Sequence, residues 1–293
     1  MLVCESCNFN SEQSRSQAQF LDEIAKAYKS ISKKIKSNNF VVNITLQQND
    51  RQLLLIESPL VESSELNGAA RWKVKDMIDF SVNDAVIDVI EIPNIKELKR
   101  SPMIYVVVVK REKIKFIVEL CNNCSSELSI IDIPDMAQRN FASLLPEDQN
   151  GVAILSINSN NSLLTITRKG ELYLSRELET GFEQLLSSVQ NQDTSLETAV
   201  EVNLVEMLQS LERMVLEVQR SLDYYEAQYS QPQINTLFLA PFAYDIPEIK
   251  DYFSTQLGIK TKILDFNLLF STDKPISLQL QSDTFYAVGS ALR

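Results

Sequence analysis

Three short apolar segments in close succession decide the fold. Residues 152–175 read VAILSINSNNSLLTITRKGELYLS. The segments 152–157, 162–168 and 170–175 are rich in β-branched and aliphatic residues, which favour strands. Asn-Ser-Asn-Asn at 158–161 and Lys-Gly at 169–170 separate them, and both are turn formers. The stretch therefore predicts a three-stranded antiparallel meander.

Helices and strands alternate after the meander. Helical spacing of apolar residues predicts helices at 181–189, 196–229, 247–257 and 284–292, and apolar runs predict strands at 234–239 and 260–264. We expect Gly258 to end the third helix. The helix at 196–229 carries one apolar stripe, formed by Leu204, Leu208, Leu211, Val215, Val218, Leu222 and Tyr225. A coiled coil would use the same stripe, but no second helix is evident to pair with it.

The sequence before the meander predicts a second α/β lobe. Strands are expected at 2–7 and 40–46, a helix at 17–37, and a strand followed by a helix at 128–133 and 136–145. Between them, a βαββα segment at about 52–124 resembles an insertion. Its helices are predicted at 63–78 and 113–124, and its strand at 103–109 is apolar throughout, so both faces should be covered.

A polar, turn-rich break at 146–150 separates the two strand series. It predicts a first lobe at 1–148 and a second lobe at 149–293. Two successive lobes of mixed sheet flanked by helices are typical of the two-lobed actin-like (ribonuclease-H-like) α/β fold.

Composition excludes several kinds of function. The 28 Lys and Arg residues against 39 Asp and Glu residues give a net charge of −11, which disfavours binding to nucleic acid or to anionic lipid. The chain has no histidine, so Ser-His-Asp and Cys-His catalysis and His-ligated metals are excluded. Six scattered glycines leave little material for a Gly-rich phosphate loop.

Two further features bear on location and metal binding. The sequence has no apolar run of the length of a membrane helix and no signal peptide pattern, so we expect a soluble cytoplasmic protein. Cys4 and Cys7, with Cys121 and Cys124, form two CxxC pairs that formally match a zinc site. Their wide separation favours four small buried residues over a metal or redox site.

Four stretches resemble a known family. They are IDIPDMAQRN at 131–140, GELYLSR at 170–176 with Gly181 following, EVQRSLDYYE at 217–226 and FYAVGSALR at 285–293. Together they resemble the MshI family of biogenesis proteins of the mannose-sensitive haemagglutinin (MSHA) type IV pilus. More distantly, the chain is similar to PilM of type IV pilus machines and to the cytoplasmic part of GspL.

The resemblance implies an actin-like protein at the cytoplasmic face of the inner membrane, which reaches the membrane only through partners. The implied partner is the cytoplasmic tail of a single-span, PilN-like (MshJ-type) protein, with the assembly ATPase or platform protein as further candidates. The tail would lie in a groove walled by part of 52–124. A GspL-like role in a type II secretion platform is the alternative within this group of proteins.

The three loops that bind nucleotide in actin-like proteins are altered or missing in this sequence. The first, an N-terminal Asp-x-Gly hairpin, has no counterpart, so either the sequence starts after it or the protein lacks it. In the second, Ser156, Asn158 and Ser159 replace the acid and the glycine. In the third, Ala240, Pro241 and Phe242 replace a Gly-rich loop. We therefore expect a non-catalytic scaffold without a cofactor, with an ATP-binding protein as the alternative.

Other polar residues are open to more than one interpretation. On the helix at 217–226, Tyr225 continues the apolar stripe, which leaves Asp223, Tyr224 and Glu226 as candidates for partner contact. Arg139, beside Asn140, is a further contact candidate, although bonding to nearby backbone is the simpler interpretation.

Three charged groups complete the survey. Asp135, near Asp132, is expected to be a helix N-cap rather than a general acid or base. Arg176 and Glu177 are expected to form an ion pair lining the cleft. The basic run at 33–36 is expected to be a solvated helix end, with a weak membrane contact as the alternative.

Overall fold

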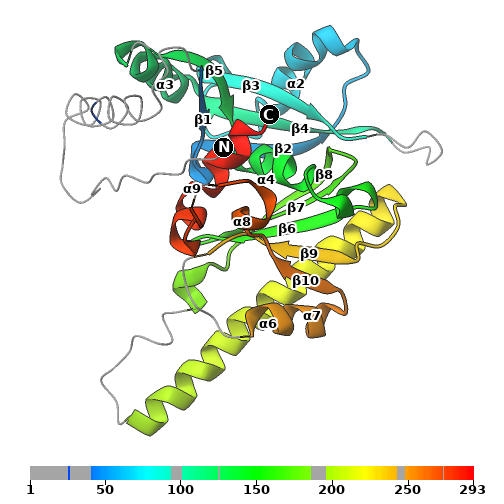
Figure 1. The fold of residues 1–293 in the computed structure, drawn as a ribbon. Helices are drawn as coiled ribbons and strands as arrows, with labels where there is room; N and C mark the ends of the chain where they lie inside the picture. The colour runs from blue at the N-terminus through cyan, green and yellow to red at the C-terminus, as the bar shows by residue number, and fades with distance from the viewer. Residues whose placement is uncertain are drawn as a thin grey trace. The chain divides into compact units, whose positions relative to one another are not determined.

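The structure is a computed structural model (Figure 1). It describes residues 26, 41–93, 101–124, 126–185, 196–242, 248–272 and 274–293, with the side chains of 196–206 excepted. The chain divides into two compact units, an N-terminal unit that ends at Ala137 and a C-terminal unit that runs from Gln138 to Arg293. The predicted lobe boundary at 148/149 falls on the short helix η5 (Pro146–Gln149), within the C-terminal unit.

The C-terminal unit is built on a five-stranded sheet. Its strands are β6 (Val152–Ile157), β7 (Ser162–Arg168), β8 (Glu171–Leu178), β9 (Thr236–Leu239) and β10 (Lys260–Ile263), in the order β10-β9-β6-β7-β8. β6, β7 and β8 pair antiparallel, which confirms the predicted meander, and β9 and β10 add parallel strands beyond β6. The turn at Lys169 and Gly170 has positive φ at both residues, as a tight hairpin requires.

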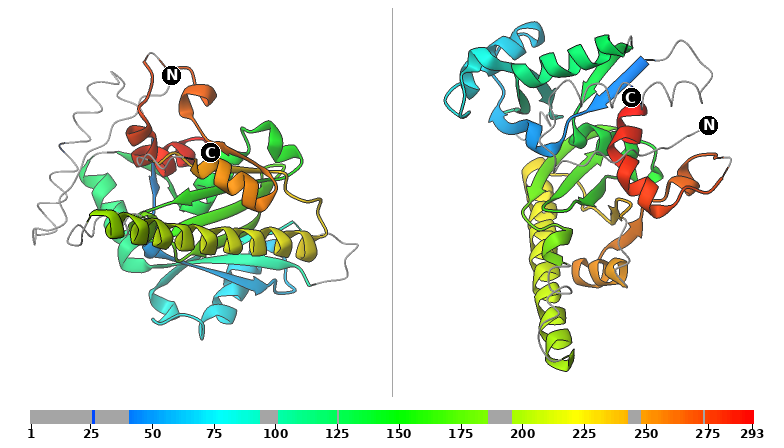
Figure 2. Two further views of the ribbon diagram at one scale, coloured as in Figure 1. Left: turned by 90° about the horizontal axis from the view of Figure 1, so that it is seen from below. Right: turned by 90° about the vertical axis from the view of Figure 1, so that its left-hand side faces the viewer.

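Both faces of this sheet are covered, because every residue of β6 is buried. Val152 and Ile154 point toward an aromatic cluster in which Phe141 of α4 (Pro134–Ala142) stacks on Phe285 of α9 (Leu278–Ala291), with ring centroids 4.7 Å apart. The opposite face is covered by α6 (Leu196–Tyr229) (Figure 2). The strand pairing skips Tyr173 of β8, whose ring packs 5.7 Å from that of Tyr225 on α6.

The N-terminal unit contains the predicted insertion. β1 (Val41–Thr45) pairs parallel with β5 (Glu127–Asp132). Between them lie β2 (Arg51–Glu57), α2 (Leu66–Val74), β3 (Ala85–Glu91), β4 (Met103–Lys110) and α3 (Arg111–Asn123), and the three strands form a separate sheet in the order β2-β4-β3. The short helices η1 (Gln48–Asp50), η2 (Ser63–Glu65) and η3 (Val82–Asp84) connect these elements.

β4 is sandwiched between two helices, as its continuous apolar sequence predicts. Ile104, Val106 and Val108 pack with the buried face of α2. Val107 and Val109 face the opposite way and pack with Ile117 of α3. Each of the two faces of the strand is therefore covered by its own helix.

Several predicted boundaries were wrong. α2 ends at Val74 rather than at 78, and it leaves Trp72 with 71% of its surface exposed. The last helix begins at Leu278 rather than at 284, because the Ser277 side chain accepts a hydrogen bond from the Leu280 N–H and caps the helix. The short helix α8 (Phe266–Leu269) was not predicted.

The remaining secondary structure predictions fall into two groups. α7 (Ile249–Leu257) ends at Gly258 with φ of 66°, as expected. The predicted strand at 2–7, the predicted helix at 17–37 (except for Lys26, which is helical) and the end of the helix predicted at 181–189 lie outside the described residues. Among the described helices, none combines the length and apolar content that a membrane crossing needs.

Replacing Phe141 should destabilise the C-terminal unit. The side chain is fully buried among Phe266, Phe270 and Phe285, so Phe141→Ala removes these three ring contacts and leaves a cavity. We expect a loss of about 3–5 kcal/mol in the free energy of unfolding, measured by urea denaturation followed by circular dichroism. Leu268→Ala, at a side chain 83% exposed, is the control and should change it by less than about 0.5 kcal/mol.

Candidate functional site

The N-terminal unit contains a groove of about 660 Å³. Four segments bring its lining together: η1 with the start of β2, the chain after α2, the end of β4, and the first turns of α3. Apolar lining comes from Phe80, Val108 and Phe116. The groove therefore lies on the inserted subdomain and on the short segment that precedes it.

Polar residues of the groove link its walls. The Lys113 Nζ lies 2.9 Å from Asp50 Oδ1, which joins α3 to η1. Gln52 Nε2 donates to Asp79 Oδ1 at 3.2 Å, which joins β2 to the chain after α2. These side chains are partly exposed, so each contact contributes little to stability and a ligand can replace it at low cost.

Lys110 is the cation of the groove that is most accessible to a ligand. Its Nζ lies 5.6 Å from the centroid of the Phe80 ring, and it makes no ion pair with a described residue. The ammonium thus stands above an aromatic face at the end of β4, where a cation–π contact holds it in place. The groove combines a small apolar surface, formed by Phe80, Val108 and Phe116, with charged side chains of both signs, of which Lys110 is the most exposed cation.

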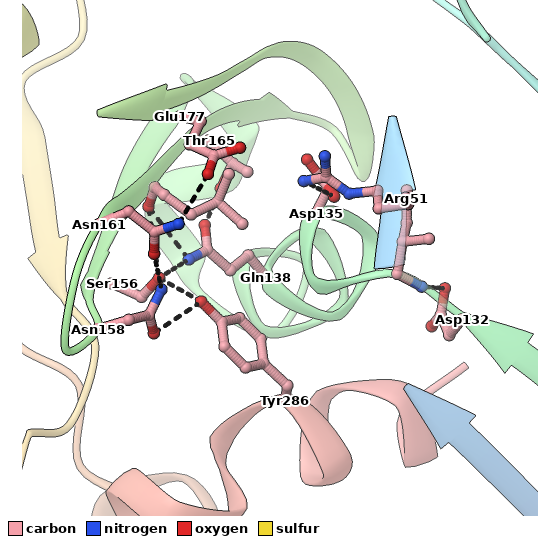
Figure 3. Close-up of polar contacts among 12 residues, drawn as sticks. Arg51, Asp132, Asp135, Gln138, Ser156, Asn158, Asn161, Thr165, Glu177 and Tyr286 are labelled. Carbon is pink, nitrogen blue, oxygen red and sulfur yellow. Dashed lines mark hydrogen bonds and ion pairs between the residues drawn. The ribbon is translucent and has the colours of Figure 1, made fainter. Parts of the chain in front are cut away.

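A buried ion pair fixes the start of β2 beside this groove. Arg51 Nη2 lies 2.6 Å from Asp135 Oδ2, and the two side chains are 4% and 0% exposed (Figure 3). Asp135 lies within the first turn of α4, so the expected N-cap role was wrong. Its neighbour Asp132 accepts from the Ile133 N–H through Oδ1 at 2.9 Å, before the helix begins. The carboxylate of Asp135 neutralises a buried guanidinium.

In the C-terminal unit, the turn after β6 is held by a network of side chains (Figure 3). The Ser156 Oγ lies 2.5 Å from the Tyr286 hydroxyl of α9, which also donates to Asn158 Oδ1 at 3.4 Å. Gln138 Nε2 donates to Ser156 Oγ at 2.7 Å, and its Oε1 accepts from Thr165 Oγ1 at 2.7 Å. Tyr286 and Gln138 therefore occupy the side of the turn on which Ser156 lies. Sequence reasoning missed both residues.

The chain after β8 closes the same turn from another side. The Phe182 N–H donates to the Asn158 carbonyl at 2.8 Å, and the Glu183 N–H donates to the Ser159 carbonyl at 2.7 Å. A Cβ on Gly181 would lie 2.5 Å from backbone atoms of Ser159, Asn160 and Asn161, so only glycine fits there.

The loop after β9, where actin-like proteins have their third nucleotide-binding loop, is packed with apolar groups. The Ala240 N–H donates to the Leu155 carbonyl at 2.8 Å, and Ala240 is 3% exposed. Beyond Pro241, the Phe242 ring lies 5.5 Å from that of Phe182. These contacts hold the loop that follows β9 against the meander.

The contact candidates lie on two elements of the C-terminal unit. On α6, Asp223 and Glu226 are exposed, Tyr224 is half-buried against Tyr229, and Tyr225 is fully buried. On α4, Arg139 Nη1 donates to Asn140 Oδ1 at 2.9 Å. Asn140 Nδ2 in turn donates to the Gly289 carbonyl, so it holds α9 rather than nearby backbone.

The predicted ion pair of Arg176 with Glu177 was wrong. The Arg176 guanidinium donates to Ser221 Oγ on α6 at 3.1 Å, whereas Glu177 Oε1 accepts from Asn161 Nδ2 at 2.7 Å. Neighbouring residues of a strand point to opposite faces of the sheet, which is why they reach different partners.

The second CxxC pair lies at the end of α3. Cys121 is buried and Cys124 is partly exposed. Burial raises the pKa of the Cys121 thiol, and Cys124 raises that pKa further, which disfavours the thiolate needed for metal binding or redox chemistry. In the described part of the chain, no three potential metal ligands cluster, and Cys4 and Cys7 lie outside it.

Comparison with known proteins identifies relatives. The model of the family described as type IV pilus assembly protein PilM matches residues 8–293. No curated protein matches the sequence. Of the solved structures, a PilM-PilN type IV pilus biogenesis complex aligns at a TM-score of 0.68 and 18% identity, over 92% of this chain and 84% of that chain. With the sheet order above, this likeness confirms the predicted actin-like α/β fold.

Two further structures are similar to a lesser degree. MreB5 of Spiroplasma citri bound to ADP aligns at a TM-score of 0.47 and 11% identity, over 93% of this chain and 74% of that chain. The cytoplasmic domain of EpsL, an inner membrane component of the type II secretion system of Vibrio cholerae, aligns at a TM-score of 0.42 and 11% identity. The alignment covers 90% of this chain and 80% of that chain.

Substitution of Gly181 should weaken the closed turn. Gly181→Ala places a methyl group against backbone that cannot rotate away, so we expect a loss of about 1–3 kcal/mol in the free energy of unfolding, measured by denaturant titration. Gly68→Ala is the matched control, because a Cβ there meets nothing within 4 Å and the site is helical; it should stabilise by about 0.5–1 kcal/mol. Equal effects of the two substitutions would contradict the tight contact.

Proposed function

The chain belongs to the family of type IV pilus assembly protein PilM, and on this premise we propose that it is a non-catalytic scaffold of the pilus assembly platform. It would work at the cytoplasmic face of the inner membrane and bind the tail of a single-span, PilN-like protein. The likeness to a PilM-PilN complex supports a partner of this kind. The stretches at 131–140 and 217–226 support the finer assignment to the MSHA pilus, in which the partner would be of the MshJ type.

The observation that carries the proposal is the groove of the N-terminal unit. Its volume is in the range of ligand pockets, and its combination of three apolar residues with polar and charged side chains of both signs suits a short peptide segment. An apolar side chain of the tail would pack on Phe80 and Phe116. A carboxylate or a backbone carbonyl of the tail would bind the Lys110 ammonium.

Two observations support the non-catalytic part of the proposal. The turn after β6 has Ser156 and Asn158 in place of an acid that would hold Mg²⁺, and the Tyr286 hydroxyl already bonds to both. The loop after β9 is filled by Phe242 and offers no Gly-rich backbone to a nucleotide.

Peptide titration tests the groove. A synthetic peptide of the cytoplasmic tail of a PilN-like protein from the same organism should bind with saturation in fluorescence anisotropy. Lys110→Glu should weaken binding about tenfold or more, because it reverses the charge of the most exposed cation of the groove. The matched control is Lys115→Glu on the exposed side of α3, which should bind as the wild type does. Equal loss in both variants would point to net charge alone and contradict the proposed site.

Nucleotide titration tests whether the chain binds ATP, which ATP-dependent catalysis would require. We expect no saturable heat when Mg-ATP is titrated into the full chain at micromolar concentration, since Tyr286 occupies the turn that phosphate would approach. Saturable binding of Mg-ATP, or its turnover, would favour an ATP-dependent assembly protein. Binding of the tail peptide by the same sample shows that the protein is folded.

A further inference from the structure

The sheet of the inserted subdomain has two edges of different character. β4 lies in the middle, so in the described part of the chain β2 and β3 each pair with it along one side only (Figure 1). The other side of an edge strand carries N–H and C=O groups that the sheet does not use. Where these groups have no partner, the edge can accept a further strand from another chain.

The register determines which residues of β2 point outward. In an antiparallel pair, every second residue directs both its N–H and its C=O toward the neighbouring strand. The Ser58 N–H donates to the Pro102 carbonyl at 2.7 Å, directly after the last pair of β2 with β4. In steps of two from this bond, the even-numbered residues of β2 face β4. The odd-numbered residues, among them Leu53, Leu55 and Glu57, therefore face outward.

Side chains protect the outward edge of β3. The Ile92 N–H bonds to β4, so by the same count the odd-numbered residues of β3 face outward. The Ala85 carbonyl accepts from the Arg111 guanidinium at 3.1 Å. The Val89 N–H donates to the Asp88 carboxylate at 2.9 Å. A charged residue at the centre of an edge strand is also a common device against pairing with another chain.

β2 lacks such protection between its ends. In the part of the chain that the structure describes, the N–H and C=O groups of Leu53 and Leu55 form no hydrogen bond. Residues 52–56 read QLLLI, without a charge or a proline. Beyond this stretch, the Glu57 carbonyl accepts from Lys73 Nζ at 3.0 Å, which closes the edge there. The open part of the edge is therefore the pair of outward-facing leucines.

This open edge begins at the groove. Residues 49–52 line the groove, and Leu53 is the next residue of β2. Leu55 lies about 7 Å farther along the strand. A peptide that occupies the groove would therefore need only about two or three extended residues to reach the outward groups. Its apolar side chains would contact the leucines of β2, which are only partly buried.

We infer that the outward edge of β2 binds an extended segment of the partner's tail as an added strand, an inference that rests on the proposed function. The tail would pair with the backbone of Leu53 and Leu55 and would make no bond to β3. Backbone hydrogen bonds would provide affinity. The uncharged stretch at 52–56 would favour an apolar, uncharged segment of the tail.

N-methylated peptides test the added strand. The probe is the labelled tail peptide of a PilN-like protein from the same organism, prepared also as a series with one backbone N–H methylated at a time. Each peptide is titrated into the full chain in fluorescence anisotropy. Methylation where the N–H points toward β2 should weaken binding about tenfold or more, because a hydrogen bond is lost and the strands are pushed apart. Methylation at the residue between two such positions should change the affinity less than about twofold, because that N–H faces away.

A proline substitution tests the same edge from the side of the protein. Leu55→Pro removes an outward N–H and no bond to β4, so the strand should still form. It should weaken binding of the unmodified peptide about tenfold. Ile87→Pro makes the same change on the outward side of β3 and should bind as the wild type does. Thermal unfolding checks that both variants are folded, and the methylated series, which uses the wild-type chain, does not depend on them.

The possible failures are distinguishable. If the unmodified peptide does not bind, the tail is not the ligand, and the proposed function and the added strand both fail. If it binds but methylation has equal effects at neighbouring positions, only the added strand is refuted. Self-association of the chain that Leu55→Pro abolishes in sedimentation, without alternation in the peptide series, would also overturn it, because a second copy would then occupy the edge.

Discussion

The structure of the C-terminal unit depends on the burial of both faces of β6. A strand at the centre of a sheet can be wholly buried only if each face has its own cover. The aromatic cluster of α4, α8 and α9 covers one face, and α6 covers the other. Because β6 is followed directly by the turn at Asn158, this requirement also determines which side chains reach the turn. Tyr286 and Gln138 come from the helices of the first face and bond to Ser156 there.

The N-terminal unit repeats this arrangement at a smaller scale with β4. Its two helices are short, and the groove is lined by the start of β2, the end of β4, the first turns of α3 and the chain that connects such elements. The buried pair of Arg51 and Asp135 fixes β2 to α4, a helix that begins in this unit and ends in the next. A buried charge is stable only with its partner, so the start of β2 has little freedom to shift. The groove is thus lined by segments whose positions the core determines.

Sequence patterns predicted the elements that local chemistry determines. The meander follows from its turn residues, the end of α7 from Gly258, and the burial of β4 from an uninterrupted apolar run. Features formed by residues far apart in the sequence were not predictable. The sequence around Asp135 predicts an N-cap, and only the fold shows its ion pair with Arg51. The sequence around Tyr286 predicts a helix of small residues, and only the fold shows that its hydroxyl bonds to Ser156. The groove was expected on the insertion, but its lining residues come from four segments that only the fold brings together.

The single tryptophan has a consequence for how the molecule is observed. Trp72 lies on α2, within the N-terminal unit, and most of its indole surface is exposed. Intrinsic tryptophan emission therefore reports on the inserted subdomain alone, and the C-terminal unit contributes only tyrosine signal. Tyrosines lie in both units, so tryptophan emission follows the inserted subdomain selectively and without a label, whereas the tyrosine signal reports on both units.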